Sequence, residues 1–193
     1  MNNYGIYAIG AALVDTEIQI DDTDLATLQI DKGVMTLVDA ERQRQLLSHL
    51  SDKLVASELA CGGSAANSII AAQYFGTKTF FSCQVADDNH GKFYADDLVR
   101  AGVATQAHAH AKPGITGKCL VMITPDAERT MNTHLGISET LSVDNIDAEA
   151  ITHSKFVYIE GYLVTSATGK PAAIKTRELA HAAGAQVAIS LSD

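Results

Sequence analysis

Short apolar runs alternate with amphipathic stretches of helical period along most of the chain. The first run, Tyr4–Ile9, ends at Gly10 and predicts a buried strand followed by a turn. The same patterns predict further strands at 77–85, 155–159 and 186–191, and helices at 40–50, 64–75, 89–101 and 168–183. Strands that alternate with helices favour a parallel sheet covered by helices on both faces, so we expect an α/β core.

Two pairs of half-polar strands do not fit this alternation. They lie at 12–20 with 33–38, and at 117–124 with 129–134. The first pair can associate across an acidic connection at 21–24, and the second pair flanks a turn as in a hairpin. We expect these strands to form a small separate sheet, a lid, inserted into the core.

Composition narrows the classes of protein that this pattern allows. The chain has 193 residues, 47% of them hydrophobic, and its 14 Lys and Arg against 23 Asp and Glu give a net charge of −9. The aliphatic content excludes intrinsic disorder, and no apolar run approaches the roughly 20 residues of a membrane-spanning helix. The acidic balance argues against non-specific nucleic-acid binding, because Lys and Arg neutralise phosphates. We therefore expect neither a nucleic acid nor a membrane as partner.

The cysteines and the N-terminus indicate the cellular compartment. Cys61, Cys83 and Cys119 lie far apart without a C-x-x-C pair, so neither a disulfide framework nor a zinc ribbon is expected. The first residues lack the basic and apolar regions of a secretory signal. We expect reduced, structural thiols and a cytoplasmic location. We expect no metal site, since His108 and His110 have no third ligand nearby.

The strongest local motif is Cys61-Gly-Gly-Ser-Ala-Ala-Asn67, at the start of a predicted helix. Gly62 and Gly63 permit unusual backbone torsions and close approach of a ligand, while the N–H groups of the helix start, with Ser64, favour bound oxygen atoms. Asn67 lies one turn further on, where its amide can bond a hydroxyl-bearing ligand. The alternative is a plain turn with Ser64 as the helix cap and Asn67 in solvent.

Two carboxylates stand at positions suited to a polar ligand. Asp15 lies beyond the Gly10 turn on the wet face of its strand, where it either accepts hydrogen bonds from sugar hydroxyls or is an ordinary exposed acid. Glu160 follows the strand at 155–159. Ligands of open parallel sheets bind beyond the carboxyl ends of the strands, so Glu160 stands at a position suited to ligand binding.

In their order and spacing, these motifs resemble those of the ribokinase (PfkB) family of sugar and nucleoside kinases, particularly its adenosine kinase-like branch. The matching segments are 10–15, 62–67 with Gly76, 85–91, 128–130 and 158–161, so the resemblance covers essentially the whole chain. It implies a Rossmann-like α/β core with a mainly parallel sheet and a small β-lid. Residues 1–193 would then be an incomplete ribokinase-like domain with lid insertions at about 12–38 and 115–135.

The resemblance also implies roles for individual residues. Asp15 would bind ribose-type hydroxyls, and the Gly62-Gly63 pair would be the hinge that couples substrate binding to closure of the lid. The remaining members of the substrate site would be Ser64, Asn67, Arg129 and Glu160.

The same resemblance implies groups that this sequence lacks. The family's catalytic aspartate lies in a Gly-Ala-Gly-Asp signature, and an Asn-x-x-Glu signature orders magnesium; both would lie downstream of residue 193. We therefore expect this chain to be the N-terminal, acceptor-binding portion of a kinase, with no catalytic residue of its own. ATP and Mg²⁺ would serve the intact enzyme and would not be fully bound here, so the isolated chain should be inactive.

The implied reaction moves the γ-phosphoryl group of Mg-ATP to a primary hydroxyl. Adenosine or a related nucleoside is the first candidate acceptor, and a ribose-type or fructose-type sugar is the second. One alternative is a non-catalytic sugar- or nucleoside-binding or dimerisation module. Another is a different Rossmann domain, against which the missing Gly-x-Gly-x-x-Gly argues. A homodimer through the lid or through an exposed sheet edge near 186–191 is a further expectation.

Overall fold

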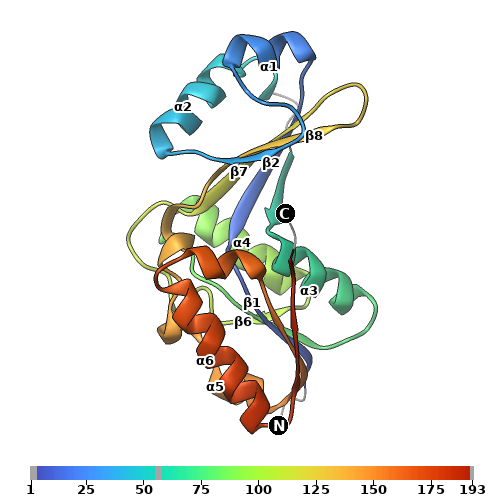
Figure 1. Ribbon diagram of the computed structural model, residues 1–193, viewed down its shortest axis with the longest axis vertical. Coiled ribbons are helices and arrows are strands. Elements are labelled where there is room, and N and C mark those ends of the chain that lie inside the picture. The colour runs from blue at the N-terminus through green and yellow to red at the C-terminus, as the bar shows by residue number, and fades with distance from the viewer. Residues whose placement is uncertain (1–3, 55–57, 192–193) are drawn as a thin grey trace.

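The core of the molecule is a parallel β-sheet. The computed structural model describes residues 4–54 and 58–191 (Figure 1). The core sheet has the strand order β10-β9-β1-β5-β6, and each neighbouring pair is parallel. Its strands are β1 (Tyr4–Ile9), β5 (Thr79–Ser82), β6 (Ala104–Thr105), β9 (Ser154–Ile159) and β10 (Gln186–Ile189). The predicted α/β architecture is confirmed.

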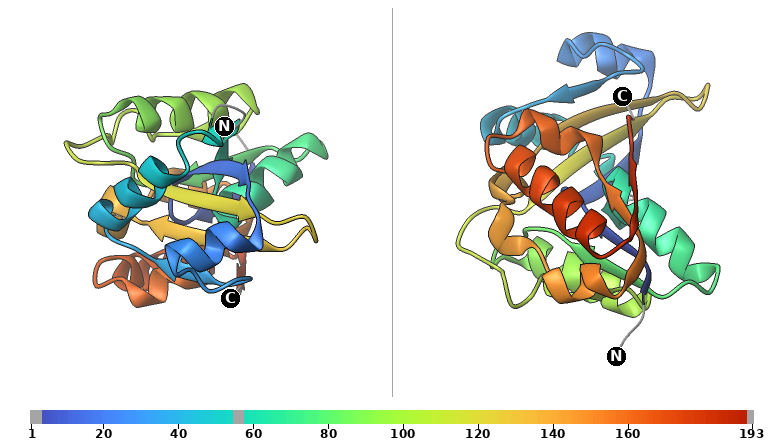
Figure 2. Two further views of the ribbon diagram at one scale, coloured as in Figure 1. Left: turned by 90° about the horizontal axis from the view of Figure 1, so that it is seen from above. Right: turned by 60° about the horizontal axis from the view of Figure 1, so that its bottom comes forward.

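Helices cover both faces of the core sheet, because successive side chains of a strand point to opposite faces. Ala8 of β1 packs in one apolar cluster with α3 and α4, whereas Tyr7 and Ile9 pack in another with α5 and α6. Figure 2 shows these two pairs of helices on opposite sides of the strands. The helices are α3 (Ser64–Tyr74), α4 (Asn89–Arg100), α5 (Ala148–Thr152) and α6 (Gly169–Ala182), with 3₁₀ helices at Gly136–Thr140, Val143–Asn145 and Gly161–Thr165.

A second, mixed sheet forms the expected lid, in the strand order β3-β8-β7-β2-β4. Its elements are β2 (Leu13–Gln19), β3 (Met35–Leu37), β4 (Glu58–Gly62), β7 (Gly117–Ile123) and β8 (Arg129–His134), with α1 (Asp22–Leu28) and α2 (Ala40–His49). Ile18 of β2 and Met122 of β7 pack against Leu25 of α1 and Leu46 of α2, so these helices cover one face of the lid. A homodimer through the lid would have to use the opposite face or the sheet edges.

The predicted hairpin of the lid is confirmed as β7 and β8, but two other expectations are wrong. Segment 33–38 does not pair with β2: β3 pairs with β8, and both edges of β2 are already occupied by β7 and β4. The acidic segment 21–24 is not a plain connection, because Asp21 and Asp24 form a capping box that starts α1. Strand β4 was not anticipated.

The cysteines and the lengths of the helices can be compared with the sequence-based expectations. Cys61, Cys83 and Cys119 are all buried and free, so the expectation of unpaired structural thiols is confirmed. Within residues 4–54 and 58–191, no helix combines the length and the apolar character needed to cross a membrane.

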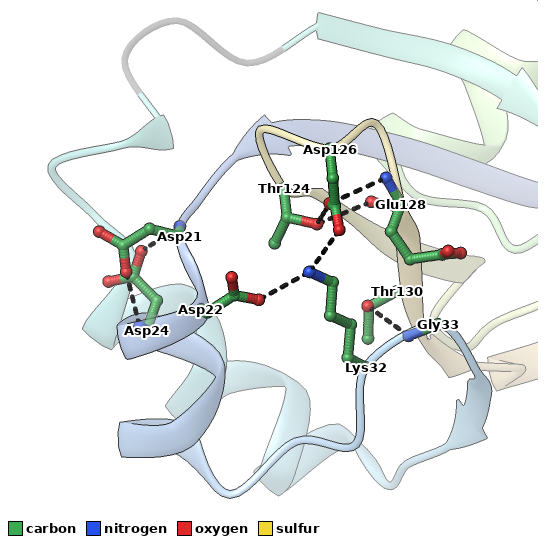
Figure 3. Close-up of polar contacts among 9 residues, drawn as sticks. All are labelled: Asp21, Asp22, Asp24, Lys32, Gly33, Thr124, Asp126, Glu128 and Thr130. Atoms are coloured by element: carbon green, nitrogen blue, oxygen red, sulfur yellow. Dashed lines mark hydrogen bonds and ion pairs between the residues drawn. The ribbon is translucent and has the colours of Figure 1, made fainter.

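A lysine ties together the outer end of the lid (Figure 3). Nζ of Lys32 donates hydrogen bonds to Oδ1 of Asp22 in α1 at 2.7 Å and to Oδ2 of Asp126 in the β7–β8 turn at 2.8 Å. The hydroxyl of Thr124 in turn donates to Oδ1 of Asp126 at 2.6 Å. Solvent-exposed ion pairs of this kind contribute little to stability, so the lid depends mainly on its apolar core.

Truncation of the lid core should therefore weaken the fold. Leu46 is fully buried between α2 and the lid sheet, and we expect Leu46→Ala to lower the free energy of unfolding by about 2–5 kcal/mol. Leu37→Ala is the matched control, because Leu37 of the lid is 57% exposed and its truncation should change stability by less than about 0.5 kcal/mol. Urea denaturation measures both values, and equal effects of the two variants would contradict this account of the lid.

Candidate functional site

Core and lid meet where the chain passes between them, which happens four times in the described residues. We call these segments the waist; they lie at 10–12, 62–63, 114–116 and 135–136. They are closely packed: a Cβ on Gly117, beside the third segment, would lie 2.7 Å from the carbonyl oxygens of both Ala12 and Leu135. A Cβ on Gly63 would lie 2.8 Å from the carbonyl oxygen of Ala11, and Gly63 has a φ of +95°, which favours glycine. Small residues at these positions let the segments touch.

The carboxyl group of Glu160 joins one waist segment to the start of α3. Its Oε2 accepts a hydrogen bond from the amide of Ala11 at 2.6 Å, and its Oε1 accepts from the hydroxyl of Ser64 at 2.6 Å and the amide of Ala65 at 3.2 Å. The side chain is 1% exposed and follows β9, at the end of the core sheet where the sequence placed it. Glu160 therefore connects the core sheet both to the β1–β2 passage and to the start of α3.

Asp15 lies directly against the backbone of Gly62, in the motif at 61–67. In the antiparallel pair of β2 and β4, Leu13 faces Gly62 and Asp15 faces Ala60. A Cβ on Gly62 would lie 2.0 Å from Oδ1 of Asp15, so only glycine leaves room for this carboxyl group. The sequence thus brings an acid and a glycine together from strands that are more than forty positions apart.

The environment of Asp15 disfavours its charged form. Burial raises the pKa of Asp15 to about 6, the charge of Arg129 opposes this shift, and that of Glu17 adds to it. The group consequently changes its charge just below neutral pH. An ionised carboxylate here has lone pairs for two hydroxyl donors, and such donors would replace part of the lost solvation.

The other residues of the motif at 61–67 have different contacts. Gly63 is the N-cap residue of α3 and no side chain caps that helix, so the alternative in which Ser64 acts as the cap does not apply. The Ser64 hydroxyl donates to Glu160 instead. The Asn67 side chain lies exposed in the first turns of α3, and the backbone N–H of Asn67 donates a hydrogen bond to the Gly63 carbonyl.

Two further contacts at the waist were not found from the sequence. The hydroxyl of Tyr94, a fully buried residue of α4, donates to the carbonyl of Gly62 at 3.1 Å. Asp88, the N-cap of α4, also accepts from the amide of Thr116 at 3.0 Å and from its hydroxyl at 2.6 Å. The only sequence signal was the capping pattern of Asp88, since a tyrosine on an apolar helix face looks like ordinary core.

Arg129 lies in the lid and outside the waist. It begins β8, is paired across the hairpin with Ile123, and its guanidinium is 3.7 Å from Oε1 of Glu17. Both side chains are about half exposed. The structure therefore gathers Asp15, Gly62, Gly63, Ser64 and Glu160 at the waist, with Arg129 on the adjoining lid and Asn67 on α3.

Comparison with known sequences finds a family and individual relatives. The family described as pfkB family carbohydrate kinase matches residues 31–193. The 5-dehydro-2-deoxygluconokinase of Shouchella clausii (strain KSM-K16) is 31% identical over 135 residues, which are 67% of this chain and 41% of that protein. The chain thus spans less than half the length of this curated relative.

Comparison with solved structures finds the same architecture. A probable sugar kinase protein from Rhizobium etli CFN 42 superposes with a TM-score of 0.92 at 31% identity. An adenosine kinase from Sinorhizobium meliloti superposes with a TM-score of 0.90 at 33% identity. Each comparison covers 100% of this chain and 57% of the other.

The raised pKa of Asp15 predicts how stability changes with pH. The folded chain holds this proton more tightly than the unfolded chain, so stability should fall as the pH rises from about 4 to about 6. Asp15→Asn cannot ionise and should gain on the order of 2 kcal/mol relative to the natural chain between pH 4 and pH 7. Urea denaturation at the two pH values measures this change.

Asp24→Asn is the control for that experiment. The hydrogen bond from Lys53 lowers the pKa of Asp24, so the stability that its charge contributes is lost only as the pH falls below about 4, and the stability of this variant relative to the natural chain should stay nearly constant between pH 4 and pH 7. A relative stability of Asp15→Asn that does not change between pH 4 and pH 7 would rule out a strained carboxylate at Asp15.

Glu160 and Ser64 allow a graded test of the waist. The amide of Glu160→Gln keeps one acceptor oxygen, so its NH₂ group must face either the Ala11 amide or the donors of Ser64 and Ala65. We expect a loss of about 2–4 kcal/mol in unfolding free energy, whereas Ser64→Ala removes a single donor and should cost about 1 kcal/mol. Equal losses in thermal or urea denaturation would show that Glu160 does not hold both segments.

Proposed function

The chain belongs to the PfkB family of carbohydrate kinases, and on this premise we propose that it forms the acceptor-binding part of an ATP-dependent sugar or nucleoside kinase. The intact protein transfers the γ-phosphoryl group of ATP to a primary hydroxyl of the acceptor. A purine nucleoside such as adenosine is the first candidate acceptor, supported by the likeness to the Sinorhizobium meliloti adenosine kinase. A ribose-type or fructose-type sugar is the second, supported by the likeness to the Rhizobium etli probable sugar kinase.

The observation that carries this proposal is the Asp15 carboxyl group against Gly62. It is a half-buried acceptor at the junction of core and lid, with a backbone beside it that leaves space only because Gly62 has no side chain. Vicinal hydroxyls of a ribose ring supply two donors to one carboxylate, which satisfies its two oxygens. Such a contact orients the ring, and orientation is the larger part of catalysis in phosphoryl transfer.

The other residues assist this contact in the proposed site. Gly62 and Gly63 form the hinge, so that a ligand held by Asp15 also fixes the start of α3. Asn67 and Arg129 supply further donors from α3 and from the lid. Glu160, whose oxygens are already engaged, acts by positioning Ser64 and the Ala11 segment.

The described residues do not fit Mg-ATP. No group of three or more His, Cys, Asp or Glu side chains gathers in this part of the chain to hold a metal ion. The carboxyl groups at the waist are the half-buried Asp15, together with Glu160 and Asp88, which already accept internal hydrogen bonds. We therefore derive no step through the nucleotide, and we propose that this chain binds the acceptor without phosphorylating it.

Calorimetry tests the acceptor site. We expect the 193-residue chain to bind adenosine or ribose without ATP, and Asp15→Asn to weaken that binding by about tenfold or more, because an amide replaces a charged acceptor. Binding should also weaken below pH about 6, where Asp15 becomes protonated. A coupled assay with Mg-ATP should show no nucleoside-dependent turnover by this chain.

The control for this experiment is Asp24→Asn, which removes a carboxyl group from the outer end of the lid and should leave the affinity unchanged. Affinity that is insensitive to Asp15→Asn, or lost equally in both variants, would contradict the proposed site. Turnover by this chain would contradict its restriction to acceptor binding.

A further inference from the structure

The face of the lid opposite its helices carries the side chains nearest to an acceptor that Asp15 would hold. Along β2 the side chains alternate, so Ile18 packs under the lid helices while Asp15, Glu17 and Gln19 share the opposite face. The register extends this face across the sheet. Asp15 faces Cys119 of β7, Glu17 faces Val121, and Gln19 faces Ile123, which in turn faces Arg129 of β8.

This face has an unequal distribution of charge. Among its described side chains on β2, β3, β4, β7 and β8, Arg129 is the only cation, and it is accompanied by Asp15 and Glu17. The Arg129 guanidinium lies 3.7 Å from Oε1 of Glu17. The cation that would otherwise bind an acidic group of a ligand is therefore ion-paired with a neighbour on its own face.

The row that contains Glu17 continues with apolar side chains. Glu17 faces Val121, Val121 faces Met131, and Met131 faces Met35 of β3. Val121 is fully buried, so beyond the proposed contact at Asp15 the lid offers an uncharged body the partly buried thioether groups of Met131 and Met35. A carboxylate or phosphate in the same place would lose hydration and meet two acids instead.

We propose that Glu17 is a specificity-determining residue that engages Arg129 and thereby selects neutral acceptors over anionic ones such as sugar acids. This inference rests on the proposed acceptor site. Discrimination between two ligands comes from repulsion of the wrong one as much as from attraction of the right one. Removal of the Glu17 charge leaves Arg129 free to bind a carboxylate bidentately and removes the nearest repelling group.

D-ribose and D-ribonate test this selection, because they differ in charge at C1, where a nucleoside carries its base. Calorimetry gives the ratio of the two dissociation constants for each variant. The natural chain should bind ribonate at least about tenfold more weakly than ribose, and Glu17→Gln should shift the ratio by about tenfold in favour of ribonate. The double variant Glu17→Gln with Arg129→Gln should lose that shift, since the cation is then absent.

Glu41→Gln is the matched control, because it removes another exposed, ion-paired carboxylate, that of Glu41 with Arg44 on α2, away from this face. It should leave the ratio unchanged. If Glu17→Gln leaves the ratio unchanged, or if Glu41→Gln changes it equally, the inference is overturned. The proposed function still stands in that case, provided that ribose or adenosine binding depends on Asp15. If the natural chain binds neither ribose nor adenosine, the proposed function fails and this selection fails with it.

Discussion

The hydrogen bonds to Glu160 are the constraint on which the geometry of the waist depends. One buried carboxyl group at the end of β9 accepts from Ala11 on one segment and from Ser64 and Ala65 on another. An unsatisfied carboxyl group in this position would be costly, so the two segments and the core sheet are held in one arrangement. Because the first segment leads into β2 and the second begins α3, the same three bonds fix the strand of Asp15 relative to the hinge glycines.

Asp15 differs from Glu160, because it is half-buried and lacks the three internal donors that engage Glu160. The raised pKa of Asp15 shows that the fold stabilises the charged carboxylate less than water does. In the proposed site, a ligand that supplies the missing donors would regain this lost stability, which is a common relation between stability and function. Gly62 makes this possible, because any larger residue would push the carboxyl group out of its place.

Sequence patterns predicted the parts of the fold that are encoded locally. Alternation identified β2, β7 and β8, and the glycines that follow α3 and α4 marked the ends of those helices. The pairing of β3 was wrong because its partner, β8, lies nearly a hundred residues away and no local signal identifies it. Strand β4 was missed because Glu58–Gly62 lacks alternation and runs into the hinge glycines.

The candidate site shows the same division between local and distant information. The motif at 61–67 and the position of Glu160 at a strand end could be found from the sequence. The partners of Glu160 could not, because Ala11 and Ser64 lie 149 and 96 residues from it in the chain. The contact between Asp15 and Gly62 likewise depends on the antiparallel register of β2 and the unpredicted strand β4.

The proposed acceptor site separates the anchoring of an acceptor from its selection. The contacts at the waist are buried and joined to the core, so they can change little without loss of the fold. On the lid face beyond Asp15, the Glu17 and Arg129 side chains are about half exposed. Substitutions there alter charge and shape at small cost in stability. If the proposed acceptor site holds, differences in acceptor preference between related chains should therefore arise first on β2 and β8 of the lid, while the contact proposed for Asp15 stays the same.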